Sequence, residues 1–221
     1  MVVLATKCYV GGAARERALD SLRSLVADDL GDLDVDVDVG LRDDDFPSVT
    51  VTGPDATAAR NLLRERWGEI TPHFETGDTY VGTLESWDDD GFVLDAGEEV
   101  RIPSDELGLG PGAPSQVRTR FGLVQHVPLQ FVWGDPPRLA DAQRDRLFDW
   151  TRGTGRLNVN SATRSEVRAT LNRAGHAKDV VTVERLGLLE QSVVCAEGTD
   201  PPGLLASVGE YLQSELLCVV P

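Results

Sequence analysis

TYVGTLESWDDDGFVLDAGEEVRIP, residues 79–103, contains three short runs of strand-forming residues separated by acidic and glycine-containing turns. The first run is Tyr80–Trp87, the second is Gly91–Gly97, and the third is Glu99–Ile102. Runs of this length, rich in aromatic and β-branched residues and bounded by Asp and Gly, are typical of neighbouring antiparallel strands. We therefore expect a small all-β unit in the middle of the chain.

This stretch and its flanks resemble the S-one-type RNA-binding OB domain. The shared features are a Gly-Asp entry at residues 77–78, a glycine early in strand one, the second strand GFVLDAG, and the segment Ile102–Leu107 after strand three. The resemblance covers residues 74–134, including the later run PLQFVWG, and implies an OB-like β-barrel that receives single-stranded bases on its second and third strands. The aromatic and histidine run that the family carries after strand three is replaced here by Pro-Ser-Asp.

Residues 1–73 are expected to form an N-terminal ferredoxin-like unit of order β-α-β-β-α. The run Val2–Val10 is expected to be a buried strand, and Ala13–Leu30 has apolar residues on one helical face. The segments LDVDVDVG and PSVTVTG are typical of two further strands, and a helix is expected to end at Trp67, before a glycine. The alternating aspartates lack the turn glycine and terminal glutamate of a calcium loop, so we expect no metal there.

Residues 135–221 are expected to form a C-terminal αβ unit with a leading helix, LADAQRDRLFDWTR, after the break Gly-Asp-Pro-Pro. Two interpretations of the remainder stay open. The favoured one is a βαββαβ unit, because SVVCAEG and ELLCVVP are typical of strands that flank a helix. The other is a helix-hairpin-helix followed by βαβ, because LNVNSATRSEV resembles the opening of such modules, although their glycine hairpin is missing. Thr163 and Glu166 have the spacing of a capping box.

The composition is strongly acidic. The 221 residues include 37 Asp and Glu against 21 Lys and Arg, a net charge of −16, and only Lys7 and Lys178 are lysines. We associate such a composition with haloarchaeal proteins that stay soluble in multimolar salt, where the Debye length is about 3 Å or less. The acidity is therefore interpreted as adaptation to salt, and it does not exclude a nucleic-acid partner.

Localisation follows from what the chain lacks. Cys8, Cys195 and Cys218 lie in apolar runs without the spacing of a zinc site, so we expect buried free thiols and a reducing cytoplasm. The N-terminus lacks the basic flank of a signal peptide, and no apolar run reaches the length of a membrane span. The expected protein is cytoplasmic, with no membrane partner.

Few residues suggest catalysis or a cofactor. There is no Walker loop, dinucleotide fingerprint, nucleophile elbow or HExxH helix. The three histidines, His73, His126 and His176, are isolated in the sequence. We therefore expect no catalytic residue, cofactor or metal.

Positive charge is concentrated in one part of the chain. Residues 138–185 hold ten of the 21 cations and only six acidic residues, a local balance of +4. The forked N–H donors of arginine suit phosphate, so these arginines are interpreted as a phosphate-binding surface. The alternative is that they pair with nearby acidic residues. Aromatic residues for stacking and cations for phosphate are what an RNA-binding surface requires. The candidate RNA-binding residues are Trp87, Phe92, Arg101, Arg118, Arg120, His126, Arg156, Asn158, Asn160, Arg164, Arg168, Arg173 and Lys178.

Two orientations are predicted for these residues. Phe92 and Arg101 are expected to point outward on one barrel face. Asn158, Asn160, Arg164 and Arg168 are expected to face solvent on a concave surface shared with Arg118 or Arg120.

Over its whole length the chain resembles an archaeal family known as domain of unknown function 2110. The segments that carry this resemblance are ATKCYV, YVGTLESWDDDGFVLDAG, FGLVQHVPLQFV, LNVNSATRSEVRATLNRAG and RLGLLEQSVVCAEGTDPPGLLASVGEYL. The resemblance implies archaeal origin but no activity.

The predicted function is non-enzymatic RNA binding or association with the ribosome. One alternative is an enzyme or small-ligand module centred on the C-terminal unit, where GTDPPG at residues 198–203 resembles an anion-binding loop before a helix. A second alternative is a protein–protein adaptor.

Overall fold

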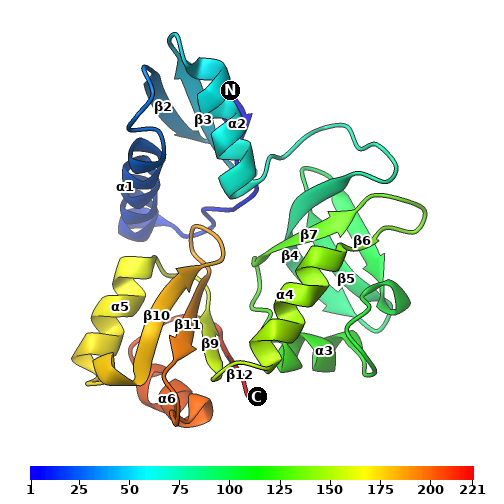
Figure 1. Cartoon of the computed structure of the whole chain (residues 1–221), viewed down its shortest axis with the longest axis vertical. Coiled ribbons are helices and arrows are strands. Elements are labelled where there is room, and N and C mark those ends of the chain that lie inside the picture. The colour runs from blue at the N-terminus through cyan, green and yellow to red at the C-terminus, as the bar shows by residue number, and fades with distance from the viewer.

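The computed structural model describes residues 1–221 and has three lobes, each built on its own antiparallel sheet (Figure 1). The predicted α+β class is confirmed, and so is the order of the three units. No helix is long and apolar enough to cross a membrane.

The N-terminal unit has the predicted βαββα order. Its sheet order, β1-β3-β2, is that of a ferredoxin-like unit without its last strand. Both helices place apolar residues every three or four positions toward the sheet, as Ala18, Leu22 and Val26 do in the first. The expected strand over Val2–Val10 is much shorter, because only Val2 and Val3 pair with β3, while Leu4 forms an isolated bridge with Glu69. The elements are β1 (Val2–Val3), α1 (Gly12–Asp29), β2 (Asp36–Leu41), β3 (Pro47–Thr52) and α2 (Ala56–Trp67).

The central unit is a curled half-barrel with the strand order β6-β5-β4-β7-β8. Gly91 is required in the turn between β4 and β5, because a Cβ there would lie 2.0 Å from the Ile102 carbonyl oxygen. Helix α4 adds Leu147 and Trp150 to the core of this sheet, although it was expected to lead the C-terminal unit. The elements are β4 (Thr79–Asp88), β5 (Gly91–Asp95), β6 (Glu99–Pro103), η1 (Ser104–Glu106), α3 (Pro114–Arg120), β7 (Pro128–Val132), β8 (Arg138–Leu139) and α4 (Asp141–Thr151).

The C-terminal unit is the favoured βαββαβ arrangement, and the helix-hairpin-helix alternative is wrong. Its sheet order, β10-β11-β9-β12, is ferredoxin-like and leaves β10 at an edge. The predicted capping box is present, since the Thr163 amide donates to Glu166 at 2.9 Å and the Glu166 amide donates to the Thr163 hydroxyl at 3.4 Å. The elements are β9 (Arg156–Val159), α5 (Arg164–Arg173), η2 (Ala177–Asp179), β10 (Val180–Arg185), β11 (Gln191–Cys195), α6 (Pro201–Val208) and β12 (Leu216–Val219).

The three units meet around the segment that follows β1. Lys7 in this segment pairs with Glu85 at 3.1 Å and Asp95 at 2.6 Å in the central unit. Thr6 accepts a hydrogen bond from the Leu188 amide of the C-terminal unit at 2.7 Å. The segment therefore ties the N-terminal unit to both of the others.

Candidate functional site

A cavity of about 600 Å³ lies where the three units meet. Two further hollows adjoin it, of about 210 and 380 Å³. The first shares Arg164 and Arg185 with the cavity, and the second shares Arg168 with the first. The three hollows are therefore neighbours along α5 and β10, and we call them together the arginine groove.

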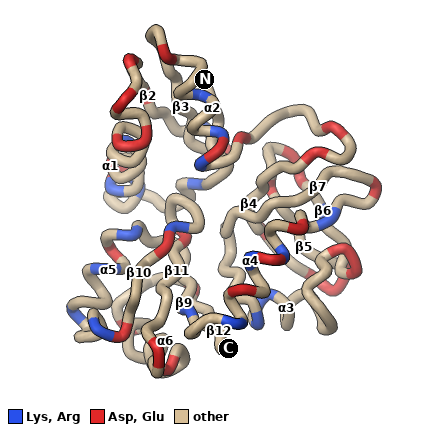
Figure 2. The backbone as a smooth tube through the Cα atoms, in the orientation of Figure 1, with Lys and Arg blue, Asp and Glu red and all other residues tan.

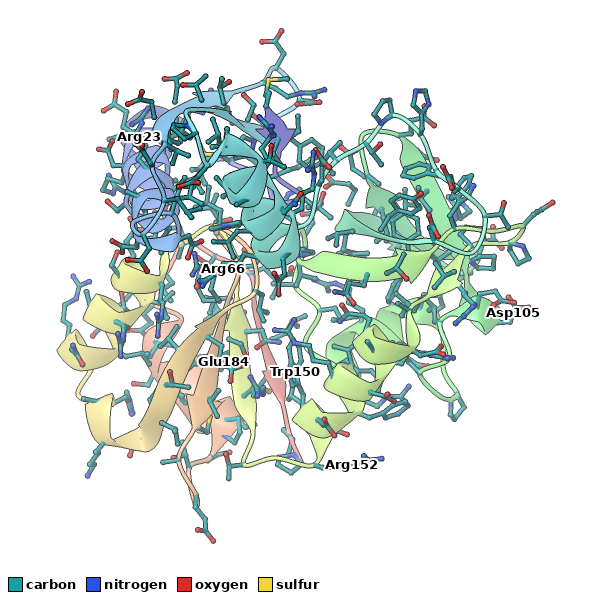
Figure 3. The ribbon with its side chains drawn as sticks, turned by 45° about the horizontal axis from the view of Figure 1, so that its top comes forward. Arg23, Arg66, Asp105, Trp150, Arg152 and Glu184 are labelled. Atoms are coloured by element: carbon teal, nitrogen blue, oxygen red, sulfur yellow. The ribbon has the colours of Figure 1, made fainter.

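Arginines from all three units line the cavity. They are Arg66 at the end of α2, Arg146 on α4, Arg164 at the start of α5 and Arg185 at the end of β10. Figure 3 shows Arg66 where the N-terminal and C-terminal lobes meet, and Glu184 on the strand β10. Figure 2 shows Lys and Arg along α5 and at the ends of α1 and α2 that face it.

Most of these arginines have no acidic partner. Arg66 pairs with Asp29 at 2.6 Å. Arg146, Arg164 and Arg185 form no hydrogen bond or ion pair within the chain, and the Arg185 Nη1 atom is buried without an acceptor. A buried guanidinium donor without an acceptor is costly, so this atom is suited to an anionic ligand.

Arg185 is held in place by an aromatic ring. Its guanidinium carbon lies 4.7 Å from the centroid of the Trp67 ring, a cation–π contact between the C-terminal and N-terminal units. Burial lowers the pKa of Arg185, and the charge of Asp29 opposes this shift only in part. The charge of Arg185 is therefore incompletely compensated inside the protein.

The floor of the cavity is formed by Thr6 and Gly187, with Glu190 beneath them. A Cβ at Gly187 would lie 2.2 Å from Glu190 Oε2 and 3.0 Å from the Thr6 hydroxyl, so only glycine fits there. Glu190 is fully buried, and Tyr9 donates a hydrogen bond to its Oε1 at 2.7 Å, while Oε2 has no partner. Burial raises the pKa of Glu190 to about 8, and the Tyr9 hydrogen bond opposes this shift.

Glu85, a second carboxylate near Tyr9, has its pKa shifted in the opposite direction to that of Glu190. The Tyr9 ring packs on His126 with centroids 4.0 Å apart, and His126 Nδ1 lies 3.3 Å from Glu85 Oε1. Burial acts to raise the pKa of Glu85, but hydrogen bonds from His126 and Thr83 and the charges of His126 and Lys7 outweigh it and lower the pKa to about 2. We call Lys7, Tyr9, Glu85, His126 and Glu190 the polar junction. Of these residues, the sequence had indicated only His126.

On the half-barrel, the predicted outward orientation of Phe92 is wrong. Phe92 is fully buried and lies opposite Ile102 in the β5–β6 pair, on the core side of the sheet. Arg101 lies opposite Val93 on the other side, where it is exposed and pairs with Asp88 at 2.8 Å. Phe92 therefore cannot stack on a base.

The other predicted RNA-binding residues on the central unit already have partners within the chain. The Arg118 guanidinium lies 3.7 Å from the centroid of the Trp87 ring and pairs with Glu215, so both side chains are occupied. Arg118 is buried, contrary to the expectation of a shared concave surface. Arg120 is exposed but donates to the carbonyl oxygens of Leu109 and Pro111, at 3.1 and 3.0 Å.

The predicted solvent exposure of Asn158 and Asn160 is also wrong. Both are buried, and their amides donate to the carbonyl oxygens of Gly122 at 2.8 Å and Gln125 at 3.2 Å. These bonds join the C-terminal sheet to the central unit. Arg156 is half-buried and pairs with Glu184 at 2.5 Å.

Four predicted cations remain available. Arg164, Arg168, Arg173 and Lys178 are exposed and form no ion pair. Arg164 and Arg168 lie in the arginine groove, as do Arg146 and Arg185, which the sequence analysis did not select. Arg173 lies instead beside Tyr211 near α6, 5.9 Å from the centroid of its ring.

Three family models together match nearly the whole chain. The DUF2110 N-terminal domain matches residues 1–73, the central domain residues 74–151 and the C-terminal domain residues 154–220. The chain belongs to the DUF2110 family. The central DUF2110 domain includes α4, in agreement with the packing of that helix on the half-barrel. No curated protein matches the chain.

Proposed function

We propose that this DUF2110 protein binds RNA and that it holds the sugar-phosphate backbone in the arginine groove. The observation that carries the proposal is the convergence of Arg146, Arg164 and Arg185, none of which forms a hydrogen bond or ion pair in the chain. In a protein with a net charge of −16, unpaired cations gathered in one groove require a reason. The guanidinium fork matches the geometry of phosphate, and several arginines together suit a ligand with successive phosphates.

The shape of the groove supports an extended ligand. Its three hollows follow α5 and the edge strand β10, so successive phosphates could contact Arg164, Arg168 and Arg185. The resemblance of the half-barrel to S-one-type RNA-binding domains supports the same class of ligand. Since Phe92 is buried and Trp87 is covered by Arg118, binding is expected to depend on the backbone more than on base stacking.

The double variant Arg164→Ser/Arg168→Ser tests this proposal. We expect weaker binding of a fluorescent single-stranded RNA, measured by anisotropy, and a slope of log affinity against log[KCl] reduced by roughly 1.4, because about 0.7 counterions are released per phosphate contact. The melting temperature should hardly change, since exposed charges contribute about 0–1 kcal/mol each. The matched control is Arg23→Ser/Arg152→Ser, two exposed arginines outside the groove. A loss of stability with unchanged RNA binding would overturn the proposal.

A second candidate function, hydrolysis, is favoured by one arrangement in the C-terminal unit. His176 Nε2 lies 2.7 Å from the Ser207 hydroxyl, and His176 Nδ1 lies 2.8 Å from Asp179 Oδ2. A serine, an imidazole and a carboxylate in this order can activate a nucleophile. Hydrolysis is only the second candidate function, because Ser207 lies near the C-terminal end of α6, where the helix dipole disfavours a developing oxyanion. The anion-binding alternative at residues 198–203 is weakened as well, since the Asp200 carboxylate already caps that helix by accepting from the Gly203 amide at 3.1 Å.

Labelling by a fluorophosphonate probe separates this second candidate from a structural role. A reactive Ser207 would be labelled in the wild type and unlabelled in Ser207→Ala, with slower labelling in Asp179→Asn. If the three residues only anchor α6 to the turn before β10, the probe leaves the wild-type protein unlabelled.

A further inference from the structure

The charge in the cavity exceeds what one internal phosphodiester could neutralise. Of its two acidic lining residues, Asp29 is paired with Arg66 and Glu184 with Arg156. This leaves Arg146, Arg164 and Arg185 without an ion pair of their own, and the charges of Asp29 and Glu184 act on Arg185 and Arg146 only from a distance. An internal phosphodiester carries one negative charge, whereas a phosphate monoester at pH 7 carries about 1.5 to 2 and has three acceptor oxygens.

The cavity is bounded on one side by buried residues. Thr6 and Gly187 form the cavity floor, both are buried, and a side chain at Gly187 would collide with Glu190 Oε2. The hydrogen bond from the Leu188 amide to Thr6 and that from Tyr9 to Glu190 hold the floor together. A strand that enters from the groove along α5 is therefore suited to end in the cavity.

We infer that the cavity is a binding site for a terminal phosphate monoester. The same chemical group occurs at the end of an RNA and on a free mononucleotide, and the cavity, at about 600 Å³, has the size of a small-ligand pocket. That its source is an RNA end rests on the function proposed above. Arg185 is the central donor of the site, with its Nη1 atom buried and its guanidinium oriented by the Trp67 ring.

The other arginines complete the site from the rim. Arg146 and Arg164 are exposed, come from different units, and can each present two parallel N–H donors to the phosphate oxygens. Arg168 lies further along the groove, where it would contact the next phosphate of an RNA. The site thus has two parts: a pocket for the terminal phosphate at Arg185, and a surface for the next phosphate of the RNA backbone at Arg168.

One single-stranded RNA sequence in four forms tests the inference: phosphorylated at the 5′ end, at the 3′ end, at both ends, or at neither. In 1 M KCl, one of the end-phosphorylated forms should bind the wild-type protein about ten-fold more tightly than the unphosphorylated RNA, the effect expected for a charge-assisted hydrogen bond. In Arg185→Gln this preference should disappear. The control is Arg173→Gln, an exposed arginine near α6 that should keep the preference.

A second variant guards against a folding defect. Arg185 packs on Trp67, so Arg185→Gln could loosen the interface between units. Arg146 also lies over an aromatic ring, 5.5 Å from the Trp150 centroid, whereas Arg164 is exposed and has no such contact. Arg164→Gln should therefore reduce the preference with an unchanged melting temperature. A full preference for the phosphorylated end in both variants would overturn the inference.

The outcomes separate the inference from the RNA proposal. If all four RNAs bind equally and Arg164→Ser/Arg168→Ser weakens the binding of each, the inference of a terminal-phosphate site is wrong and the proposal of RNA binding is supported. If AMP binds in an Arg185-dependent manner and no RNA binds, the phosphate pocket stands and RNA binding is wrong. If neither RNA nor AMP binds, both are wrong.

Discussion

At the residue scale, two carboxyl groups of the polar junction, the buried Glu190 and the half-buried Glu85, respond to pH in opposite directions. Glu190 has its pKa raised to about 8 by burial, whereas Glu85, beside Lys7 and His126, has its pKa lowered to about 2. Glu190 therefore stabilises the fold when protonated, and this contribution is fully present below about pH 4.5 and is lost as the pH rises through 8. The contribution of Glu85 is present above about pH 4.5 and is lost only as the pH falls toward 2.

Glu190→Gln should therefore flatten the pH dependence of the free energy of unfolding between pH 4.5 and 8. In the wild type, Glu190 should lower this free energy by at most about 1.4 kcal/mol per pH unit across the window. Denaturant unfolding at constant KCl measures the slope, with Glu197→Gln, an exposed position, as the control. An equal slope in Glu190→Gln and the wild type would contradict the assignment.

At the element scale, α5 and β10 carry most of the arginine groove. Helix α5 begins at Arg164, directly after its N-cap Thr163, so the position of this groove arginine depends on how the helix starts. The Thr163 hydroxyl satisfies the Glu166 amide, and the Glu166 carboxylate satisfies the Thr163 amide. The capping box thus fixes the first turn, from which Arg164 extends into the cavity.

Thr163→Ala should lower the free energy of unfolding by about 1 kcal/mol, the usual cost of losing an N-cap side chain. It should also weaken RNA binding modestly, because the first turn then frays and Arg164 loses its fixed position. Denaturant unfolding and RNA anisotropy check the two effects. Ser24→Ala, at an exposed position within α1, is the control and should change neither. An unchanged unfolding free energy in Thr163→Ala would show that the cap contributes nothing.

At the scale of the whole molecule, the three units share apolar as well as polar contacts and carry much negative charge on their outside. Leu188 and Leu189 of the C-terminal unit lie in the core of the N-terminal unit, and Val219 lies in that of the central unit. Figure 2 shows Asp and Glu over the outer loops of the N-terminal and central lobes. The net charge of −16 opposes compaction by self-repulsion, and salt reduces that repulsion. The Debye length falls from about 10 Å at 0.1 M to about 3 Å at 1 M.

The melting temperature should accordingly rise as KCl is increased from 0.1 to 2 M. RNA affinity should fall over the same range, because salt screens the arginine groove as well. Thermal unfolding and anisotropy in one KCl series measure both trends. A melting temperature that falls or stays constant over this range would contradict the interpretation of the acidity as adaptation to salt.

The local elements of this protein were predictable from its sequence because their signals are short-range. Apolar periodicity indicated α1, turn residues indicated the β4–β5–β6 meander, and the spacing of Thr163 and Glu166 indicated the start of α5. The concentration of arginines between residues 138 and 185 also indicated the region of the groove. Each of these signals lies within about twenty neighbouring residues, or in composition alone.

Side-chain orientation and long-range pairing were decided only by the tertiary structure. Alternation along a strand defines two faces but not which one is covered, so Phe92 faces the core, although it had been expected outside. Asn158 and Asn160 are buried because the central unit supplies their hydrogen-bond partners. Tyr9 and Glu190 are 181 residues apart, and no local pattern relates them. The arginine groove, with residues from three units, exists only because packing brings those units together.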